Sequence, residues 1–217
     1  MIRKALLVAA ATIAMVTAAL SAAPVAAAGP PTITGGSLIR FSDGSSCSVS
    51  FVDPVHPRVI YTAAHCYDGS TAVMAGRYRI GHFRPDWVYN KKLDLVAIQL
   101  YSDVPSVATQ CRTEGCYRFG EPRMPKIGDY VCKWGAKTQE TCGTVLNVWE
   151  HDFAIQMPVK HGDSGAPIYQ IDSDGGAHLL GIVDSVGLRD STIAYGTIIT
   201  RITDLLESTW GPNWRMA

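Results

Sequence analysis

The sequence has few charged residues and no cluster of basic ones. Charged side chains make up 18% of the 217 residues, and 19 lysines and arginines balance 19 aspartates and glutamates. Proteins that bind nucleic acid or anionic membrane surfaces carry a basic patch or stripe. Because none is present, neither partner is favoured, and we look for a partner that binds in a pocket.

Long apolar runs are absent except at the N-terminus. There Arg3 and Lys4 precede an alanine-rich stretch that ends in small residues at Ala28. This order is typical of a secretory signal peptide, so we expect residues 1–28 to be cleaved. An uncleaved membrane anchor is the alternative, because the run is about 20 residues long and would nearly span a bilayer. Pro24 and the weakly hydrophobic alanines favour cleavage, which leaves 189 residues with a formal charge of −2 and no stable membrane insertion.

The sequence also lacks a C-x-x-C pair, and none of its six histidines has the spacing of a zinc ligand. An even number of cysteines in an exported chain is best explained by disulfides, here three of them. The sequence alone does not choose among the possible connectivities, but we favour the pairing of neighbours. We therefore expect no metal and no cofactor, and disulfides within the set Cys47, Cys66, Cys111, Cys116, Cys132 and Cys142.

No repeat of fixed period and no low-complexity linker interrupts the chain after residue 28. Instead, short β-branched and aromatic runs such as SLIRF, RVIYTA and LVAIQLY alternate with glycine, proline, aspartate and serine. This pattern predicts an all-β barrel or sandwich. Residues 201–210 are an exception, because Ile202, Leu205, Leu206 and Trp210 recur at helical spacing. They predict a short C-terminal helix that docks on the β-structure.

Residues 102–126 are rich in proline, glycine and charge, which is typical of a connection between two units. We therefore expect a boundary near residue 115.

Ser164 lies in the stretch VKHGDSGAPIY, where glycines on both sides indicate a tight turn. A serine that attacks a carbonyl group needs a base and donors for the developing negative charge. His65 ends the run RVIYTAAHC, and a disulfide at Cys66 would fix the backbone beside its ring. Asp94 precedes the apolar run LVAIQL, where a carboxylate needs a partner. A turn serine and a strand-end histidine are the plain alternatives.

The segments TAAHC, LDLVAIQL and GDSGAP, in that order, resemble the catalytic blocks of the chymotrypsin-like serine peptidases. ITGGSLIRFSDGSSCSVSFV and VCKWGAKTQETCGTV are similar to the secreted bacterial branch of streptogrisin and alpha-lytic type, in which the second segment carries a disulfide across a hairpin. The resemblance implies two six-stranded antiparallel Greek-key barrels. Residues 29–115 would form the barrel with His65 and Asp94, and residues 116–217 the barrel with Ser164 and the C-terminal helix.

The resemblance also implies a role for each matching residue. Ser164 would be the nucleophile, His65 the general base and then acid, and Asp94 the carboxylate that orients the imidazole. The backbone N–H groups of Gly162 and Ser164 would form the oxyanion hole.

Asp163, next to the serine, matches an aspartate that bacterial relatives pair with an internal basic side chain. Here that side chain is Lys133, where the branch typically has an arginine. Because lysine lacks the planar fork of arginine, the pair would be less rigid. We expect Lys133 to hold Asp163 and so shape the oxyanion hole.

The stretch GIVDSVG matches the strand that pairs with an extended substrate. The alignment is uncertain by one residue, so either Asp184 or Ser185 lies beside the triad. Val186 and Gly187 would then line the wall of the substrate pocket.

Pro158 stands where trypsin-type enzymes carry an aspartate, so a preference for arginine or lysine is not supported. Lys160 and His161 would lie near the pocket and favour an acidic side chain, although solvation alone explains Lys160.

These observations predict a secreted, monomeric serine endopeptidase whose partner is a peptide or protein substrate. The alternative is a catalytically weak or inactive protease-fold protein that serves binding or adhesion, because a fold does not establish an activity. A lipase or esterase is disfavoured, since its histidine would follow the serine, whereas His65 precedes Ser164.

Overall fold

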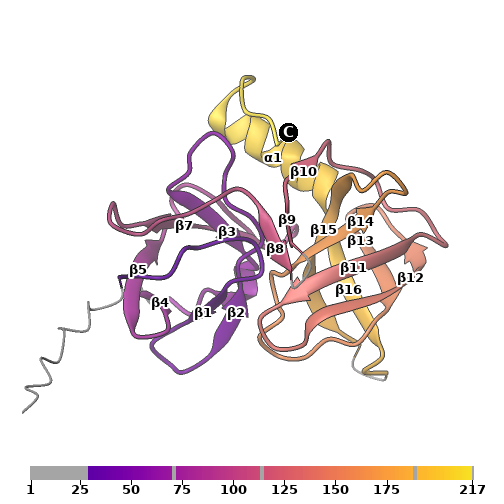
Figure 1. The fold of residues 1–217 in the computed structure, drawn as a ribbon, viewed down its shortest axis with the longest axis horizontal. Coiled ribbons are helices and arrows are strands. Elements are labelled where there is room, and N and C mark those ends of the chain that lie inside the picture. Colours follow the sequence, from indigo (N-terminus) through magenta and orange to yellow (C-terminus); the bar gives the residue numbers. More distant parts are fainter. Residues whose placement is uncertain (1–28, 70–71, 113–114, 188–189, 217) are drawn as a thin grey trace, which may run out of the picture.

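The computed structural model describes residues 29–69, 72–112, 115–187 and 190–216. Two barrel-like sheets lie side by side, and a C-terminal helix lies along the ends of both (Figure 1). The expected signal peptide, residues 1–28, lies outside the described residues. Within the described part of the chain, no helix has the length and apolar character needed to cross a membrane.

The first sheet has seven strands in the order β2-β1-β4-β5-β7-β3, with β6 paired to β7. Beyond β2 the chain turns to meet β3, where Ser50 N–H donates to Tyr61 O over 2.7 Å and Val52 bridges Ile60. This contact closes the barrel. Its strands are β1 (Leu38–Arg40), β2 (Ser46–Ser48), β3 (Val59–Thr62), β4 (Val73–Ala75), β5 (Tyr78–Phe83), β6 (Tyr89–Asn90) and β7 (Leu95–Leu100).

The second sheet also has seven strands, in the order β10-β15-β14-β11-β12-β13-β16, and the pairing of β15 with β16 closes it. Six antiparallel strands form the closed ring, and β10 adds to it in parallel. The strands are β10 (Phe119–Gly120), β11 (Tyr130–Gly135), β12 (Gln139–Val148), β13 (Asp152–Gln156), β14 (Pro167–Ile171), β15 (Ala177–Val186) and β16 (Ile193–Ile198). The expected double barrel is thus confirmed.

A two-stranded hairpin, β8 (Gln110–Arg112) with β9 (Gly115–Tyr117), follows the first barrel. It contains residue 115, where we expect the boundary. Cys111 lies directly opposite Cys116 in the backbone register. The disulfide expected between them lies outside the described side chains.

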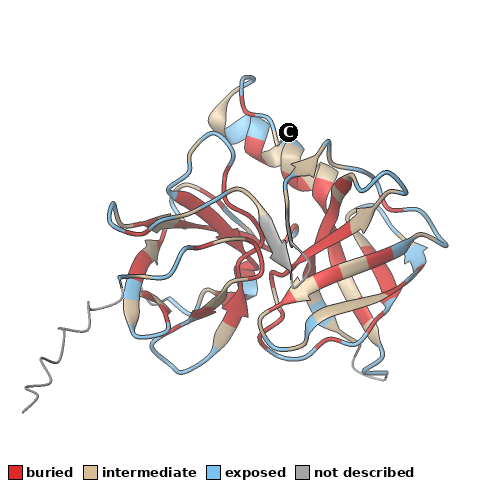
Figure 2. Cartoon of the chain, in the orientation of Figure 1, coloured by how far each residue is buried: buried red, intermediate tan, exposed pale blue. Residues whose placement is uncertain are grey.

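Three hydrophobic clusters hold the fold together. One fills each barrel, and Figure 2 shows buried residues concentrated in the strands and the exposed ones mostly in the loops. The third cluster joins the barrels to the helix and includes Leu95 of β7, Ile182 of β15 and Ile202 of the helix. Leu95 directly follows Asp94, and Ile182 lies two residues before Asp184. The packing that joins the barrels therefore also positions the residues beside the candidate site.

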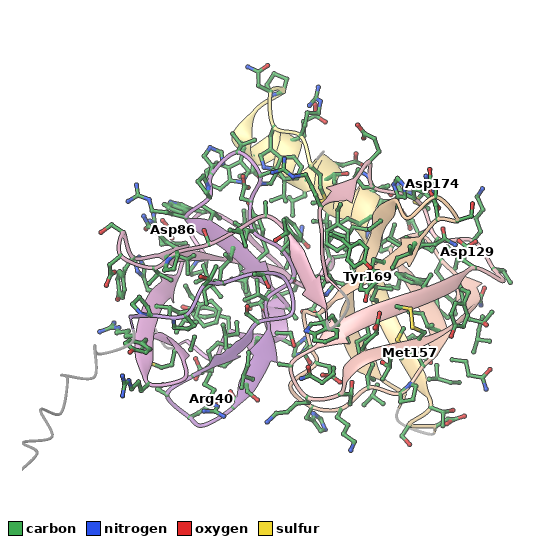
Figure 3. All side chains as sticks on the ribbon, in the orientation of Figure 1. Arg40, Asp86, Asp129, Met157, Tyr169 and Asp174 are labelled. Atoms are coloured by element: carbon green, nitrogen blue, oxygen red, sulfur yellow. A yellow bond between two sulfur atoms is a disulfide. The ribbon has the colours of Figure 1, made fainter. Side chains whose placement is uncertain are left out.

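The C-terminal helix, α1 (Ile199–Trp210), confirms the expected helix and begins two residues earlier. Its inner face buries Ile199, Ile202 and Leu206. Figure 3 labels Tyr169 and Met157, which are both buried in the second half of the molecule, and Asp174 on an outer turn; Met157 belongs to the cluster that fills the second barrel, and Tyr169 packs against Phe119 of β10.

A buried polar network fixes the end of the chain to the first barrel. The carboxylate of Asp53, with no exposed surface, accepts hydrogen bonds from Tyr61 Oη over 2.7 Å and from Trp214 Nε1 over 2.8 Å. Trp210 Nε1 donates to Tyr61 Oη over 2.9 Å. Because a buried carboxylate needs such donors, this network serves as a structural anchor. Burial and the charge of Asp53 both raise the pKa of Tyr61.

Candidate active site

His65 lies in a single 3₁₀ turn, η1 (Ala64–Cys66), directly after β3. A disulfide joins Cys66 to Cys47 of β2, so the backbone on the carboxyl side of His65 is fixed covalently. The neighbouring Ala64 and Cys66 are buried, whereas 46% of the His65 side chain is exposed. The turn therefore anchors the backbone in the core and leaves the imidazole accessible.

Asp94 faces His65 from the residue before β7. Its Oδ2 lies 2.8 Å from His65 Nδ1, and its Oδ1 accepts the backbone N–H of His65 over 2.9 Å. The side chain is only 11% exposed. Its φ of 43° falls in the left-handed region, which a non-glycine residue adopts at a cost of about 1–2 kcal/mol. The strain is located where the carboxylate is aimed at the imidazole.

The carboxylate of Asp94 determines the tautomer of the His65 imidazole and raises its pKa. A carboxylate accepts hydrogen bonds, so Nδ1 of His65 carries the proton and Nε2 is left with its lone pair. The hydrogen bond to Asp94 raises the pKa of His65 above its usual value. Burial opposes the increase, and the negative charges of Asp94 and Asp184 add to it. The ring is thus suited to accept a proton at Nε2.

Ser164 lies between two glycines that no other residue would replace easily. Gly162 has a φ of 100° and Gly165 a φ of 82°. A Cβ at Gly165 would lie 2.6 Å from Ser48 O and 2.6 Å from Thr62 Oγ1. The turn therefore requires glycine for its backbone conformation and for its close packing.

The turn around Ser164 is held by β2 of the other barrel. Ser48 N–H donates to Ser164 O over 2.8 Å, and Ser48 Oγ donates to Gly162 O over 2.8 Å. Because Ser48 follows Cys47, which is bonded to Cys66, the serine turn and the histidine turn are attached to the same short strand. This connection fixes the two halves of the site relative to each other.

Asp163 points away from the cleft and is completely buried with Lys133. Its Oδ2 lies 3.6 Å from Lys133 Nζ and accepts the hydroxyl of Thr138 over 2.7 Å, while Lys133 Nζ also donates to Thr138 Oγ1. The backbone N–H groups of Lys137 and Lys160 complete the cage at 2.9 Å each. The expected Lys133–Asp163 pair is therefore present, and the threonine between its members was not foreseen.

The protonation states in this buried cage follow from its contacts. Burial alone would raise the pKa of Asp163, but the Thr138 hydrogen bond and the Lys133 charge hold it below the usual value. Burial lowers the pKa of Lys133, and Asp163 opposes that effect.

A cleft of about 520 Å³ opens beside His65, Asp94 and Ser164. A second depression of about 470 Å³ shares His65, His161 and Ser164 with it and extends over the Cys47–Cys66 disulfide. An extended peptide that occupied the first cleft and continued into the second depression would pass Ser164. The full lining of the first cleft is His65, Lys91, Lys92, Asp94, Asp152, Val159, Lys160, His161, Ser164, Val183, Asp184, Ser185 and Val186.

Most residues expected near the pocket line this cleft, and two do not. Gly187 and Pro158 are not part of its lining; Gly187 N–H instead donates to Ile193 O over 2.7 Å, and Pro158 O accepts Thr141 Oγ1 over 2.9 Å. Of the two candidates for the place beside His65 and Asp94, Asp184 lies there and Ser185 is exposed.

Five further lining residues were not predicted from the sequence: Lys91, Lys92, Asp152, Val159 and Val183. Lys91 and Lys92 immediately precede Leu93 and Asp94, so their closeness in sequence was a usable signal. Asp152 gave none, because it reaches the cleft through the pairing of β13 with β16.

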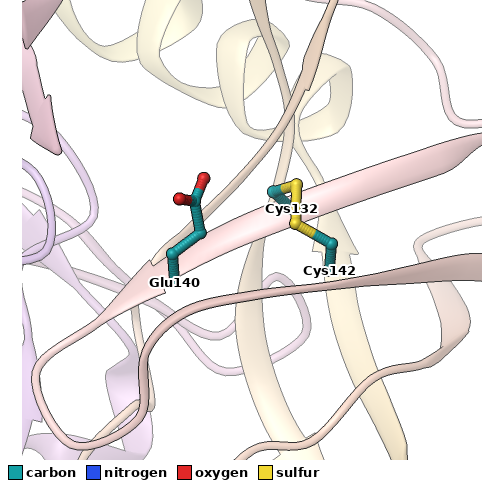
Figure 4. Close-up of side chains that lie close together, drawn as sticks. All are labelled: Cys132, Glu140 and Cys142. Carbon is teal, nitrogen blue, oxygen red and sulfur yellow. A yellow bond between two sulfur atoms is a disulfide. The ribbon is translucent and has the colours of Figure 1, made fainter. Parts of the chain in front are cut away.

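The second disulfide, Cys132–Cys142, spans the β11–β12 hairpin, where the two residues are direct register partners. Figure 4 shows Glu140 beside it, with atoms close enough to suggest a ligand set for a metal. The two sulfurs are bonded to each other, and Glu140 accepts the hydroxyl of Tyr169 over 2.8 Å. A Cys₂Glu metal site would require breaking this disulfide, since thiolates are the ligands.

Two contacts that catalysis would use are open in this structure. Ser164 Oγ and His65 Nε2 are not hydrogen-bonded to each other, although both residues line the cleft. Among the described residues, none accepts a hydrogen bond from the N–H groups of Gly162 or Ser164. Such contacts often form only with substrate bound, and free N–H groups in a turn are available to a ligand oxygen.

No protein-family model matches the chain. The uncharacterized protein Rv1815 of Mycobacterium tuberculosis strain H37Rv is 34% identical over 192 residues, which cover 82% of this chain and 84% of that protein. The uncharacterized protein MT1863 of strain CDC 1551 matches to the same extent.

Solved structures of bacterial proteases share the architecture. Thermobifida fusca protease A has a TM-score of 0.64 at 21% identity, covering 81% of this chain and 96% of that one. A glutamic acid specific serine protease has a TM-score of 0.68 at 20% identity, covering 80% and 97%. At such identities the likeness concerns the fold. The chain therefore belongs to the family of the mycobacterial protein Rv1815 and has the fold of the chymotrypsin-like bacterial serine proteases.

Proposed function

We propose that this protein is a secreted serine endopeptidase that cleaves peptide bonds through an acyl-enzyme. The observation that carries the proposal is the 2.8 Å contact between Asp94 Oδ2 and His65 Nδ1 in the cleft that Ser164 also lines. Because this contact keeps the ring proton on Nδ1, Nε2 of His65 is left to accept a proton on the side of the cleft. An exposed imidazole with an oriented tautomer and a serine in the same cleft support nucleophilic catalysis.

In the proposed reaction, His65 Nε2 takes the proton of Ser164 as its Oγ attacks the substrate carbonyl. The N–H groups of Gly162 and Ser164 bind the oxyanion of the tetrahedral intermediate. His65 then gives the proton to the leaving amine, and the acyl-enzyme forms. A water molecule, deprotonated by His65, hydrolyses the ester and restores Ser164. Asp94 stabilises the imidazolium in both steps.

The substrate is an extended peptide that lies along β15. Ser185 and Val186 offer backbone and side-chain contacts in the cleft, and Lys160 and His161 border it. Two disulfides in the described part of the chain are consistent with an oxidising, extracellular environment. Cleavage of the signal peptide after Ala28 completes the proposal.

Digestion of a mixed peptide library by the purified protein tests the proposed activity. We expect defined cleavages by the wild-type protein, and a loss of about 10³-fold or more in turnover for Ser164→Ala, because the acyl-enzyme cannot form. Binding of peptides without cleavage by the wild-type protein would instead support the binding or adhesion alternative. Cleavage by Ser164→Ala at the wild-type rate would rule out Ser164 as nucleophile.

Lys133→Met tests the proposed role of the buried cage. The substitution removes the charge that faces Asp163 at 3.6 Å and leaves Thr138 as a hydroxyl partner. We expect the serine turn to relax and kcat to fall by about 10²-fold, comparable with the loss of one oxyanion donor. Lys126→Met, at an exposed position, is the control. An unchanged kcat for a folded Lys133→Met protein would show that the cage does not shape the oxyanion hole.

A further inference from the structure

Asp184 lies at an irregular point of β15, directly beside the serine turn. The β15–β16 register pairs Val183 with Gly196 and Ser185 with Tyr195, so Asp184 falls within a β-bulge. Val183 is held by two backbone hydrogen bonds to the serine turn, from Gly165 N–H to Val183 O at 2.7 Å and from Val183 N–H to Ala166 O at 2.8 Å. Because a bulge redirects a side chain, Asp184 is turned toward the triad.

The carboxyl group of Asp184 forms one cluster with Asp94 and His65. A carboxylate oxygen of each aspartate and a ring nitrogen of His65 all lie within 4.8 Å of one another. Two carboxylates this close repel each other, so at acidic pH one of the two groups keeps a proton, and its O–H can donate a hydrogen bond to the other. Asp94 already accepts two N–H groups of His65. The proton therefore belongs to Asp184.

The pKa of Asp184 depends on its burial and on the charged groups around this cluster. Burial raises the pKa of Asp184 to about 6, the nearby negative charge of Asp94 adds to the increase, and the charge of His65 opposes it. Asp152, at the start of β13, faces the cluster and adds a smaller increase. The charged and titratable groups that line the cleft around Asp184 are His65, Asp94, Asp152, Lys91, Lys92, Lys160 and His161.

We propose that Asp184 is a second acidic partner of His65, a positioning residue that holds Asp94 through a shared proton at acidic pH and adds a second negative charge beside the imidazole when it ionises. Its role in turnover rests on the proposed peptidase function, whereas its electrostatic coupling to His65 does not. Apart from Asp94, the other charged side chains that line the cleft are three lysines and Asp152, whereas Asp184 belongs to the cluster that contains the His65 ring.

The direction of the coupling follows from the charges. Below about pH 6, the carboxyl group of Asp184 is neutral, and its O–H donates a hydrogen bond to the Asp94 carboxylate. Above that pH, two carboxylates face His65 and stabilise the imidazolium. A neutral residue at position 184 therefore leaves His65 easier to deprotonate. A unit charge within 5 Å shifts a pKa by about one unit or more in a partly buried site.

Nuclear magnetic resonance titration of the histidine ring tests the coupling without any need for activity. The purified protein carries labelled histidine, and His65→Gln assigns the His65 signal. In the wild-type protein we expect the titration curve of the His65 ring signal to show two steps. One is the protonation of His65 itself, and the other lies near the pH at which Asp184 ionises. In Asp184→Asn we expect one step, with the His65 pKa about one unit lower. Identical titration curves for the two proteins would overturn the proposal.

Two further variants separate charge from structure. Asp152→Asn removes an acid from the same cleft and is expected to leave both His65 steps in place. Asp184→Ser keeps a hydroxyl donor for Asp94 without the charge, so its single step should match that of Asp184→Asn. If Asp184→Ser instead behaved like wild type, the negative charge would have no role and the proposal would fail.

Thermal unfolding gives an independent readout of the same group. A carboxyl group with a raised pKa in the folded state contributes stability below its unfolded pKa, near 4, which is lost as pH rises through about 6. The melting temperature of Asp184→Asn relative to wild type is therefore expected to rise between pH 4 and pH 7. A difference that does not change with pH would contradict the shared proton.

The pH profile of kcat/KM links the coupling to turnover. We expect the acidic limb of Asp184→Asn to move to lower pH by the shift measured for His65. Coupling without peptidase activity in the wild-type protein would refute the proposed function and leave the electrostatic inference intact. Activity with an unmoved acidic limb, together with identical titration curves, would refute the inference and leave the proposed function intact.

Discussion

Asp94→Asn is expected to lower kcat by about 10⁴-fold with little change in the fold. Asp94 accepts two N–H groups of His65, over 2.8 and 2.9 Å. An asparagine in its place presents an amide that can donate to Nδ1, which would put the ring proton on Nε2. In that tautomer His65 cannot accept the proton of Ser164. The measurement is single-turnover hydrolysis of an activated peptide ester, with circular dichroism to verify folding.

Asp86→Asn is the matched control for this prediction. Asp86 is an aspartate of the same barrel whose side chain is 61% exposed and pairs with Arg84. Surface pairs of this kind contribute little to stability, so kcat should stay within about twofold of wild type. Equal rates for Asp94→Asn and Asp86→Asn would show that the His65–Asp94 contact serves the fold and not the reaction.

Gly165→Ala is expected to destabilise the protein more than any other small substitution discussed above. A Cβ there would lie 2.6 Å from Ser48 O, 2.6 Å from Thr62 Oγ1 and 2.9 Å from Ala63 N. Two of these atoms belong to the backbone and cannot move without shifting the β2 strand or the histidine turn. The left-handed conformation costs about 1–2 kcal/mol and the overpacking about 1–3 kcal/mol more. Denaturant unfolding should show the sum as a lower free energy of unfolding.

Gly175→Ala separates these two costs. Gly175 has a similar φ of 87°, but no atom lies within 4 Å of the Cβ that alanine would add. This variant should therefore lose only the conformational part, about 1–2 kcal/mol. If both variants lost the same free energy of unfolding, the close approach of the two barrels at Gly165 would not be the constraint that the structure indicates.

The strands and the helix were predictable because their signals are local, whereas the double barrel was implied by the resemblance to the chymotrypsin-like serine peptidases. Short β-branched runs separated by turn residues indicated strands, and the spacing of Ile202, Leu206 and Trp210 indicated the helix, whose observed bounds differ by two residues at its start. The pairing of Cys47 with Cys66 and of Cys132 with Cys142 agrees with the expectation of neighbour pairing. The catalytic roles of His65, Asp94 and Ser164 stay predictions, although the structure brings these residues to one cleft.

The parts that the sequence could not supply depend on register and on distant contacts. A one-residue shift in a strand exchanges its two faces, so the choice between Asp184 and Ser185 depended on a bulge that no turn signal marks. Asp152 enters the cleft only because β13 pairs with β16. Thr138 lies between Lys133 and Asp163 because the hairpin returns over the serine turn. The pairing of Asp152 with Thr197 and the hydrogen bond of Thr138 to Asp163 both join residues far apart in the chain.

Labelling with a fluorophosphonate probe tests the central claim, that Ser164 is a nucleophile activated by His65. The account predicts one labelled site in the purified wild-type protein, located at Ser164 by mass spectrometry of the digest. Ser164→Ala should take up no label, His65→Ala should react far more slowly, and Asp103→Ala, at an exposed position, should react like wild type. Folded wild-type protein that stays unlabelled under conditions that label a known serine peptidase, or label that persists in Ser164→Ala, would contradict the account.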